Sequence, residues 1–244
     1  MSLINKSYIF GHRGFMGKYI ENTMEGFKKA VSLGVGIESD VQLTKDGQLV
    51  CFHDSSFKIE KKWYKVSKLT LEEMRDLPFP DKRIIPTVYE LLQTFKERNS
   101  DLRYSFDIRS KAEGVKLINL ISKFNLLDRV EITDKRISVL TNLRNYSKLV
   151  NLVYTVPENL KHIKKEVELG VLKDLKINTL NIFSIRANSR NLKDIIDNNF
   201  NCYVWNVNYK LRMKKVFSFS YKNEYIKAIY TDFPDRALKI RRQL

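Results

Sequence analysis

Short apolar runs alternate along the whole chain with segments in which apolar residues recur at three- and four-residue spacing. The runs are rich in β-branched and aromatic residues, which favours strands, and the other segments have the period of amphipathic helices. The pattern predicts eight strands, at residues 7–10, 37–43, 102–108, 130–132, 149–154, 179–184, 202–205 and 228–231. Alternating strands and helices imply a parallel sheet, and eight such units in one chain of this length predict a closed (β/α)8 barrel, the TIM barrel.

Local signals predict where several of the helices begin. Two capping boxes are predicted, one formed by Thr70 with Glu73 and the other by Thr87 with Glu90. The second is expected to begin a helix that ends near Arg98. We expect Asn22 to cap the helix at 26–33 and Ser189 to cap a later one. Pro157 suits the first turn of a helix to Gly170. Further helices are expected at residues 112–124, through 139–143, at 210–220 and at 233–244, and residues 57–68 are expected to form a surface excursion.

Composition is typical of a globular protein, with 43% apolar and 30% charged residues. No apolar run reaches the length that spans a bilayer, and the first residues lack the apolar core of a signal peptide. We therefore expect a cytoplasmic protein. No Gly/Ser- or Pro-rich linker divides the sequence, so we expect one domain over residues 1–244. Cys51 and Cys202 lie in strand-like runs and are expected to be buried free thiols.

The formal net charge is +16, which favours an anionic partner. The lysines and arginines are scattered, with no basic block of five or six residues. We therefore expect no nucleic-acid partner, whereas transient contact with an anionic membrane remains open. The charge would also attract an anionic small-molecule substrate. The sequence leaves the oligomeric state undetermined.

The stretch from Gly34 to Asp54 contains the strongest candidate for chemistry. Glu38 and Asp40 stand two residues apart in a predicted strand, so their side chains share one face. Two carboxylates held together repel each other unless a cation lies between them, and a hard divalent cation prefers oxygen ligands. The turn at Asp46-Gly47 returns the chain to His53, within reach of the pair. A metal ion beside a histidine suggests phosphoester chemistry.

Other polar side chains follow the predicted strands at their carboxyl ends, where barrel enzymes carry their active sites. These residues are His12 and Arg13, Asp107 and Arg109, Trp205 and Asn206, and Asp232. We expect Asp232 to cap the last helix rather than to enter the site.

Seven short motifs occur in one order across nearly the whole chain. They are His12-Arg13-Gly14, Glu21-Asn22-Thr23, Glu38 to Gly47, His53-Asp54, Ile85-Pro86-Thr87, Val204 to Asn208 and Tyr230 to Asp235. In this set and order, the sequence resembles the glycerophosphodiester phosphodiesterase family. The resemblance implies a TIM barrel, a divalent cation (Mg or Ca), and hydrolysis of a glycerophosphodiester to glycerol 3-phosphate and an alcohol, a step of lipid and glycerol metabolism.

The resemblance also implies a role for each matching residue. The metal ligands would be Glu38, Asp40 and Asp107, and the acid/base pair would be His12 and His53. Substrate and phosphate would contact Arg13, Arg109 and Trp205, with Glu21 as a further candidate. The family usually has Glu and Lys where this chain has Asp107 and Arg109, so the third ligand is one methylene shorter here. This departure bears on metal affinity and substrate fit.

Two other functions remain compatible with the sequence. One is a lysophospholipase D or another phospholipase-type phosphodiesterase on the same barrel, which an exposed apolar lip around the site would favour. The other is a non-catalytic barrel that binds anionic polymers through its charge. The head group of the substrate and the choice between Ca and Mg are not determined by the sequence.

Overall fold

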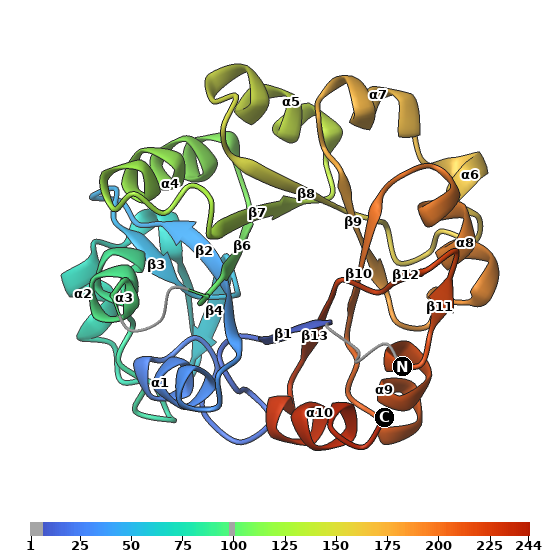
Figure 1. The fold of residues 1–244 in the computed structure, drawn as a ribbon. Helices are drawn as coiled ribbons and strands as arrows, with labels where there is room; N and C mark the ends of the chain where they lie inside the picture. The colour runs from blue at the N-terminus through green and yellow to red at the C-terminus, as the bar shows by residue number, and fades with distance from the viewer. Residues whose placement is uncertain (1–6, 98–100) are drawn as a thin grey trace.

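Eight parallel strands form a closed barrel in the computed structural model, which describes residues 7–97 and 101–244 (Figure 1). Each strand pairs with the next around the ring, and β1 pairs with both β13 and β2, which closes it. The strands are β1 (Tyr8–Gly11), β2 (Gly36–Leu43), β6 (Tyr104–Ile108), β7 (Val130–Asp134), β8 (Asn151–Thr155), β9 (Thr179–Phe183), β10 (Asn201–Trp205) and β13 (Ala228–Thr231). The predicted TIM barrel is confirmed, and no strand bound differs from its prediction by more than two residues.

Helices surround the barrel and cover its outer face (Figure 1). They are α1 (Met24–Ser32), α2 (Leu71–Arg75), α3 (Val88–Phe95), α4 (Lys111–Lys123), α5 (Ile137–Tyr146), α6 (Ile163–Glu166), α7 (Leu169–Asp174), α8 (Ser189–Asp197), α9 (Lys210–Phe217) and α10 (Pro234–Arg241). The main apolar core lies between these helices and the strands, with fully buried residues such as Phe27, Leu91 and Ile121. Both predicted capping boxes are confirmed, at Thr70 and at Thr87. The expected end of α3 at Arg98 lies outside the described residues.

Three local predictions about helices were wrong. Thr23, not Asn22, caps α1, because the Asn22 side chain turns to Asp40 and Ser39 instead. Asn188, not Ser189, caps α8 by accepting a hydrogen bond from the backbone N–H of Asn191. Pro157 begins no helix: the chain stays irregular to residue 162, and two short helices, α6 and α7, follow.

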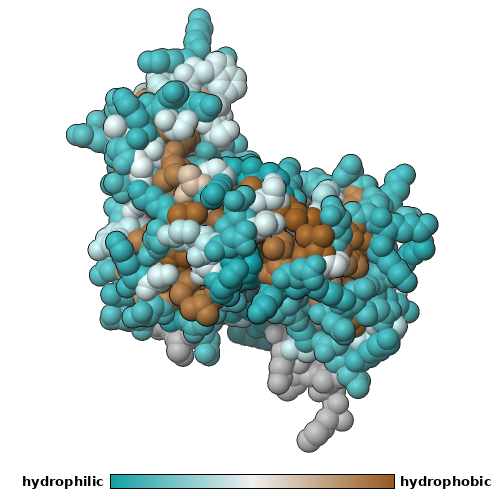
Figure 2. Space-filling model, turned by 90° about the horizontal axis from the view of Figure 1, so that it is seen from above, coloured by the Kyte–Doolittle hydropathy of each residue, from teal (hydrophilic) through white to brown (hydrophobic). Residues whose placement is uncertain are grey.

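A segment inserted between β2 and α3 adds a second, smaller apolar core. β3 (Leu49–Cys51) returns antiparallel to β2, as predicted. The expected surface excursion at residues 57–68 forms, with Ser56, an unpredicted hairpin of β4 (Ser56–Ile59) and β5 (Lys62–Lys65), followed by the 3-10 turn η1 (Val66–Lys68). Its inward side chains pack with Phe52 and Met74. In Figure 2 a mainly hydrophilic lobe projects on the side where Figure 1 places β3, β4 and α2.

A second hairpin, β11 (Ser220–Tyr221) with β12 (Glu224–Tyr225), was also not predicted. It follows α9, which ends at Phe217 rather than near residue 220. Within the described part of the chain, no helix is long and apolar enough to cross a bilayer. Cys51 and Cys202 are free and buried, as expected.

Aromatic side chains fill the interior of the barrel below its carboxyl end. Phe10, Tyr203 and Tyr230 form a cluster inside the ring, and the Phe10 and Tyr230 rings stack at 4.9 Å. The guanidinium of Arg103 lies 5.3 Å from the centre of the Phe10 ring and is bonded to Glu131. This packing leaves the opposite end, where the strands terminate, as the open mouth of the barrel.

Candidate active site

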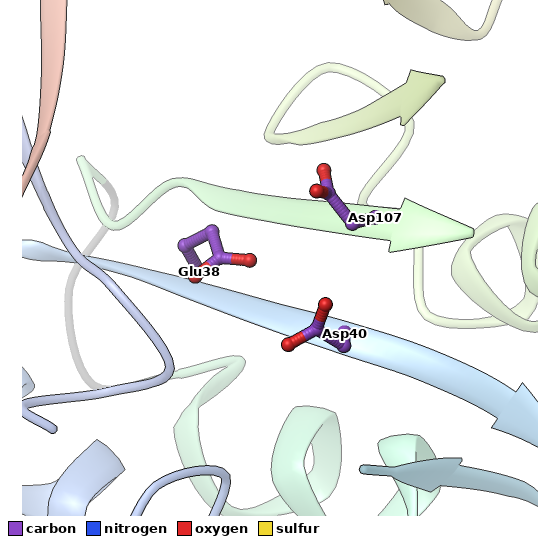
Figure 3. Close-up of side chains that lie close together, drawn as sticks. All are labelled: Glu38, Asp40 and Asp107. Atoms are coloured by element: carbon purple, nitrogen blue, oxygen red, sulfur yellow. The ribbon is translucent and has the colours of Figure 1, made fainter. Parts of the chain in front are cut away.

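Three carboxylates converge at the mouth of the barrel. Glu38 and Asp40 project from the same face of β2, and Asp107 projects from β6, where it is in register with Asp40. The ligand oxygens of the three residues all lie within 4.8 Å of one another (Figure 3). The strand periodicity and the parallel register therefore bring together three residues that are far apart in the sequence.

The electrostatics of this carboxylate triad favour a bound cation. Burial raises the pKa of Glu38 to about 7, and the neighbouring Asp40 carboxylate adds to the rise. Burial, followed by the charges of Glu38 and Asp40, also raises the pKa of Asp107. Anionic oxygens held this close are destabilised without a counter-charge. Three carboxylates with no sulfur or imidazole nitrogen among them suit a hard ion such as Mg²⁺ or Ca²⁺.

Neighbouring groups fix the orientation of these carboxylates. The backbone N–H of Arg13 donates a hydrogen bond to Glu38 Oε2 at 2.7 Å. The side-chain amide of Asn22 donates to Asp40 Oδ2 at 3.2 Å, and Asn22 in turn accepts from the Ser39 hydroxyl at 2.7 Å. Asn22 adopts a positive φ of 53°, a conformation that Asn tolerates better than most residues. The Glu-Asn-Thr motif thus supports the triad.

His12 is held between the triad and the end of β13. Its Nδ1 lies 2.7 Å from Asp232 Oδ1, and its Nε2 lies 3.9 Å from Glu38 Oε2. Asn208 donates to the other Asp232 oxygen at 2.6 Å and accepts from the Asp232 backbone N–H at 2.9 Å. Although burial lowers the pKa of His12, the charge of Glu38 and the hydrogen bond with Asp232 raise it, and the net direction is upward.

The expected capping role of Asp232 was therefore wrong. Phe233 occupies the N-cap position of α10, with no side-chain cap bond. The carboxylate of Asp232 is instead committed to His12 and Asn208. Asp232 stands two residues before Pro234, so a helix cap was the natural interpretation of the sequence. Only the closure of the ring between β13 and β1 brings its side chain to His12.

His53 has the same arrangement on the other side of the triad. Its Nδ1 lies 2.7 Å from Asp54 Oδ1, and its Nε2 lies 3.9 Å from Asp40 Oδ1. The Gln42 side chain donates to the His53 carbonyl at 2.8 Å, which fixes the returning segment against β2. The side chains of His12 and His53 are 32% and 34% exposed, so both can reach a ligand in the mouth. Each imidazole thus presents Nε2 to the triad and keeps Nδ1 on a carboxylate.

Arginines surround the same carboxylates. Arg13, with a positive φ of 48°, places Nε 3.1 Å from Asp40 Oδ2 and Nη1 2.5 Å from Glu21 Oε2. Glu21 also lies 3.7 Å from Arg83, which belongs to the inserted segment. Arg109 is 45% exposed and places Nη2 3.6 Å from Asp40 Oδ1. The predicted site residue Glu21 therefore contacts Arg13 rather than the triad.

A cavity of about 470 Å³ opens over the triad and extends across the mouth. The lining includes every predicted site residue except Glu21. The Trp205 indole forms part of the wall, with its ring centre 4.5 Å from that of Phe183. Residues of the lining that the sequence analysis did not propose include Thr133, Asp134, Lys135, Arg136, Thr155, Glu158, Asn181 and Tyr230. Thr133 and Asn181 could have been found as polar residues within otherwise apolar strands.

A family model and two curated proteins match this chain in sequence. The model of the glycerophosphoryl diester phosphodiesterase family matches residues 12–236. A glycerophosphodiester phosphodiesterase of Bacillus altitudinis is 28% identical over 257 residues, covering 97% of this chain and 98% of that protein. One from Caldanaerobacter subterraneus is 36% identical over 143 residues, covering 52% of this chain and 58% of that protein.

A solved structure shares the fold. The Oleispira antarctica phosphodiesterase, determined in complex with the product sn-glycerol-3-phosphate, superposes with a TM-score of 0.80 at 17% identity. The superposition covers 96% of this chain and 96% of that one. At this identity the likeness establishes the barrel fold.

Proposed function

Because the chain belongs to the glycerophosphoryl diester phosphodiesterase family, we propose that it hydrolyses a glycerophosphodiester to glycerol 3-phosphate and an alcohol, using a divalent cation and two histidines. The observation that carries the proposal is the carboxylate triad with one imidazole on each side. Both Nε2 atoms lie 3.9 Å from a carboxylate oxygen of the triad.

Glu38, Asp40 and Asp107 would hold the cation, Mg²⁺ or Ca²⁺. When bound there, such an ion would neutralise charge on the phosphoryl oxygens of the substrate. Arg13 and Arg109 already lie against Asp40, and their guanidinium groups face the same mouth. The planar guanidinium matches the geometry of phosphate oxygens, so these arginines would orient the diester and stabilise its developing charge.

The two histidines would move the protons. The carboxylate at each Nδ1 fixes the orientation of the ring, so proton exchange would take place at Nε2, next to the triad. One imidazole would accept the proton of the nucleophile, and the other would donate a proton to the departing alkoxide. Trp205, which stands in the cavity wall, would pack against the carbon skeleton of the glycerol group.

The proposal is tested by release of glycerol 3-phosphate from glycerophosphocholine. The enzyme is assayed after treatment with EDTA and again after addition of Mg²⁺ or Ca²⁺. We expect release that requires the ion and that disappears in His12→Ala and His53→Ala. A protein that binds anionic polymers normally but releases no glycerol 3-phosphate from any glycerophosphodiester would support the non-catalytic alternative instead.

A further inference from the structure

A set of exposed apolar side chains surrounds the mouth of the barrel. Among the described residues, ten large apolar side chains are exposed. We call four of these the apolar rim: Trp63 (67% exposed) on the inserted hairpin, Ile185 (61%) after β9, and Tyr209 (77%) and Leu211 (82%) after β10. Apolar groups gathered in this way beside a binding cavity mark an interaction surface.

Three of the rim residues lie in the segments that follow two neighbouring strands, with Leu211 in the first turn of α9. Ile185 follows β9, whereas Tyr209 and Leu211 follow β10, the adjacent strand. Ser184 joins the two loops: its backbone N–H donates to the Trp205 carbonyl at 3.0 Å and its hydroxyl to the Asn206 carbonyl at 2.8 Å. Because Trp205 and Asn206 line the cavity, these two segments leave the barrel beside the cavity wall.

Trp63 lies on the inserted hairpin, which is also attached at this end of the barrel. The segment that carries it begins directly after His53 and Asp54. Its far end is fixed to the turn beyond β2, where the Lys45 backbone N–H donates to the Leu69 carbonyl at 2.7 Å. The lobe in Figure 2 lies on this side of the molecule. The rim therefore has members on two sides of the mouth.

Cationic side chains accompany the apolar rim. Lys61 and Lys62 precede Trp63 on the hairpin, and Lys210 separates Tyr209 from Leu211; all three are exposed. Lys135, exposed on the loop after β7, lines the cavity itself. Within the part of the chain that the structure describes, neither Lys61, Lys135 nor Lys210 is paired with a carboxylate. The net charge of +16 gives the whole molecule the same sign.

We propose that the apolar rim and its lysines bind the protein to an anionic lipid surface with the cavity mouth facing the bilayer. Aromatic and aliphatic side chains would enter the headgroup region, and the lysines would contact the lipid phosphates. Leu211 and Ile185 favour lipid over a nucleic-acid partner, whose phosphates offer these side chains nothing to bury. If the proposed function holds, the enzyme would act on diesters at the membrane. The proposed membrane binding does not depend on that function.

Sedimentation with vesicles tests the proposal. The native protein is mixed with vesicles of phosphatidylcholine alone or with added phosphatidylglycerol, at low and high salt. We expect binding to the vesicles that contain phosphatidylglycerol, weakened by salt. The double variant Tyr209→Ser/Leu211→Ser should bind these vesicles about tenfold more weakly, because it loses two apolar contacts with the lipid.

Leu149→Ser is the matched control, since Leu149 is 75% exposed in the turn between α5 and β8, at the opposite end of the barrel. It should bind as the native protein does. Hydrolysis of soluble glycerophosphocholine should be unchanged in the double variant. This assay tests the proposed function, whereas vesicle sedimentation tests membrane binding, so the failure of one is distinguished from the failure of the other. Absence of vesicle binding, or equal binding by native protein and double variant, would overturn the proposal. The proposal would also be overturned if the native protein bound duplex DNA more tightly than vesicles and the double variant bound the DNA equally well.

Discussion

His12 and Asp232 lie 220 positions apart in the sequence, yet His12 Nδ1 and Asp232 Oδ1 are 2.7 Å apart in the folded protein. The contact exists because β1 and β13 are neighbours in the closed ring, with Gly11 in register with Thr231. A carboxylate at Nδ1 directs the other ring nitrogen, Nε2, toward the triad. Asp232 is therefore a positioning residue for one of the two proposed proton carriers.

Replacing Asp232 by Asn should impair turnover without unfolding the barrel. We expect kcat to fall about 10- to 100-fold, because the imidazole loses its orientation and part of its stabilisation when protonated. Since Asp232 raises the pKa of His12, the limb of the pH–rate profile that belongs to His12 should move to lower pH. The measurement is kcat/KM against pH.

Asp235→Asn is the control for that experiment. It makes the same chemical change in the first turn of α10, where the carboxylate contacts Lys18 at 2.6 Å on the surface. Its pH profile should match that of the native enzyme. An Asp232→Asn enzyme with native kcat and an unshifted profile would show that the contact with His12 has no part in turnover.

Stability without metal should fall as the pH rises. The pKa of Glu38 is about 7 in the folded protein, against 4.5 as its ordinary value. Between these pH values the Glu38 carboxyl keeps its proton in the folded state and has lost it in the unfolded state. The contribution of Glu38 to the free energy of unfolding is therefore fully present below pH 4.5 and is lost as the pH rises toward 7. The loss is roughly 3 kcal/mol from this one group.

Thermal unfolding in EDTA at a series of pH values measures this effect. The Glu38→Gln variant, which has no proton to lose, should show a shallower decline. Added Mg²⁺ or Ca²⁺ should stabilise the native protein more at pH 7 than at pH 5, because the ion competes with protons for the same oxygens. A metal-free protein whose stability rises across this range would contradict the raised pKa.

The third carboxylate offers a direct comparison of side-chain length. Asp107 is one methylene shorter than the glutamate expected from the family resemblance. Asp107→Glu should extend the carboxylate toward Glu38 and Asp40 and lower the ion concentration that gives half-maximal activity, by about tenfold. A titration of activity with Mg²⁺ and with Ca²⁺ measures it. An unchanged or higher ion requirement would show that the native backbone already compensates for the shorter side chain.

The strands and the carboxylate triad could be predicted because their signals are local and periodic. Glu38 and Asp40 share a face by the two-residue period of a strand. Asp107 was a candidate from its place at the next strand end, and the family resemblance implied its role as the third ligand. The β4–β5 hairpin was missed because only Phe57 and Ile59 alternate inward within it. The second hairpin turns at Lys222 and Asn223, both at positive φ, with no glycine to signal the turn.

Long-range contacts explain two of the wrong predictions about helix caps. Nothing near Asp232 in the sequence indicates His12, and nothing near Asn22 indicates that its side chain supports Asp40. In both cases a cap is the strongest local interpretation, and a partner brought by the closed ring or by the adjacent strand takes the side chain instead.

The most direct test of the central claim is glycerol 3-phosphate release by native enzyme and Asp107→Asn, each measured over a range of Mg²⁺ and Ca²⁺ concentrations after EDTA treatment. The native enzyme should be inactive without an ion and active with one, and Asp107→Asn should need far more ion or stay inactive. Release that persists in EDTA, or an Asp107→Asn enzyme with the native ion requirement, would contradict an ion held by Glu38, Asp40 and Asp107.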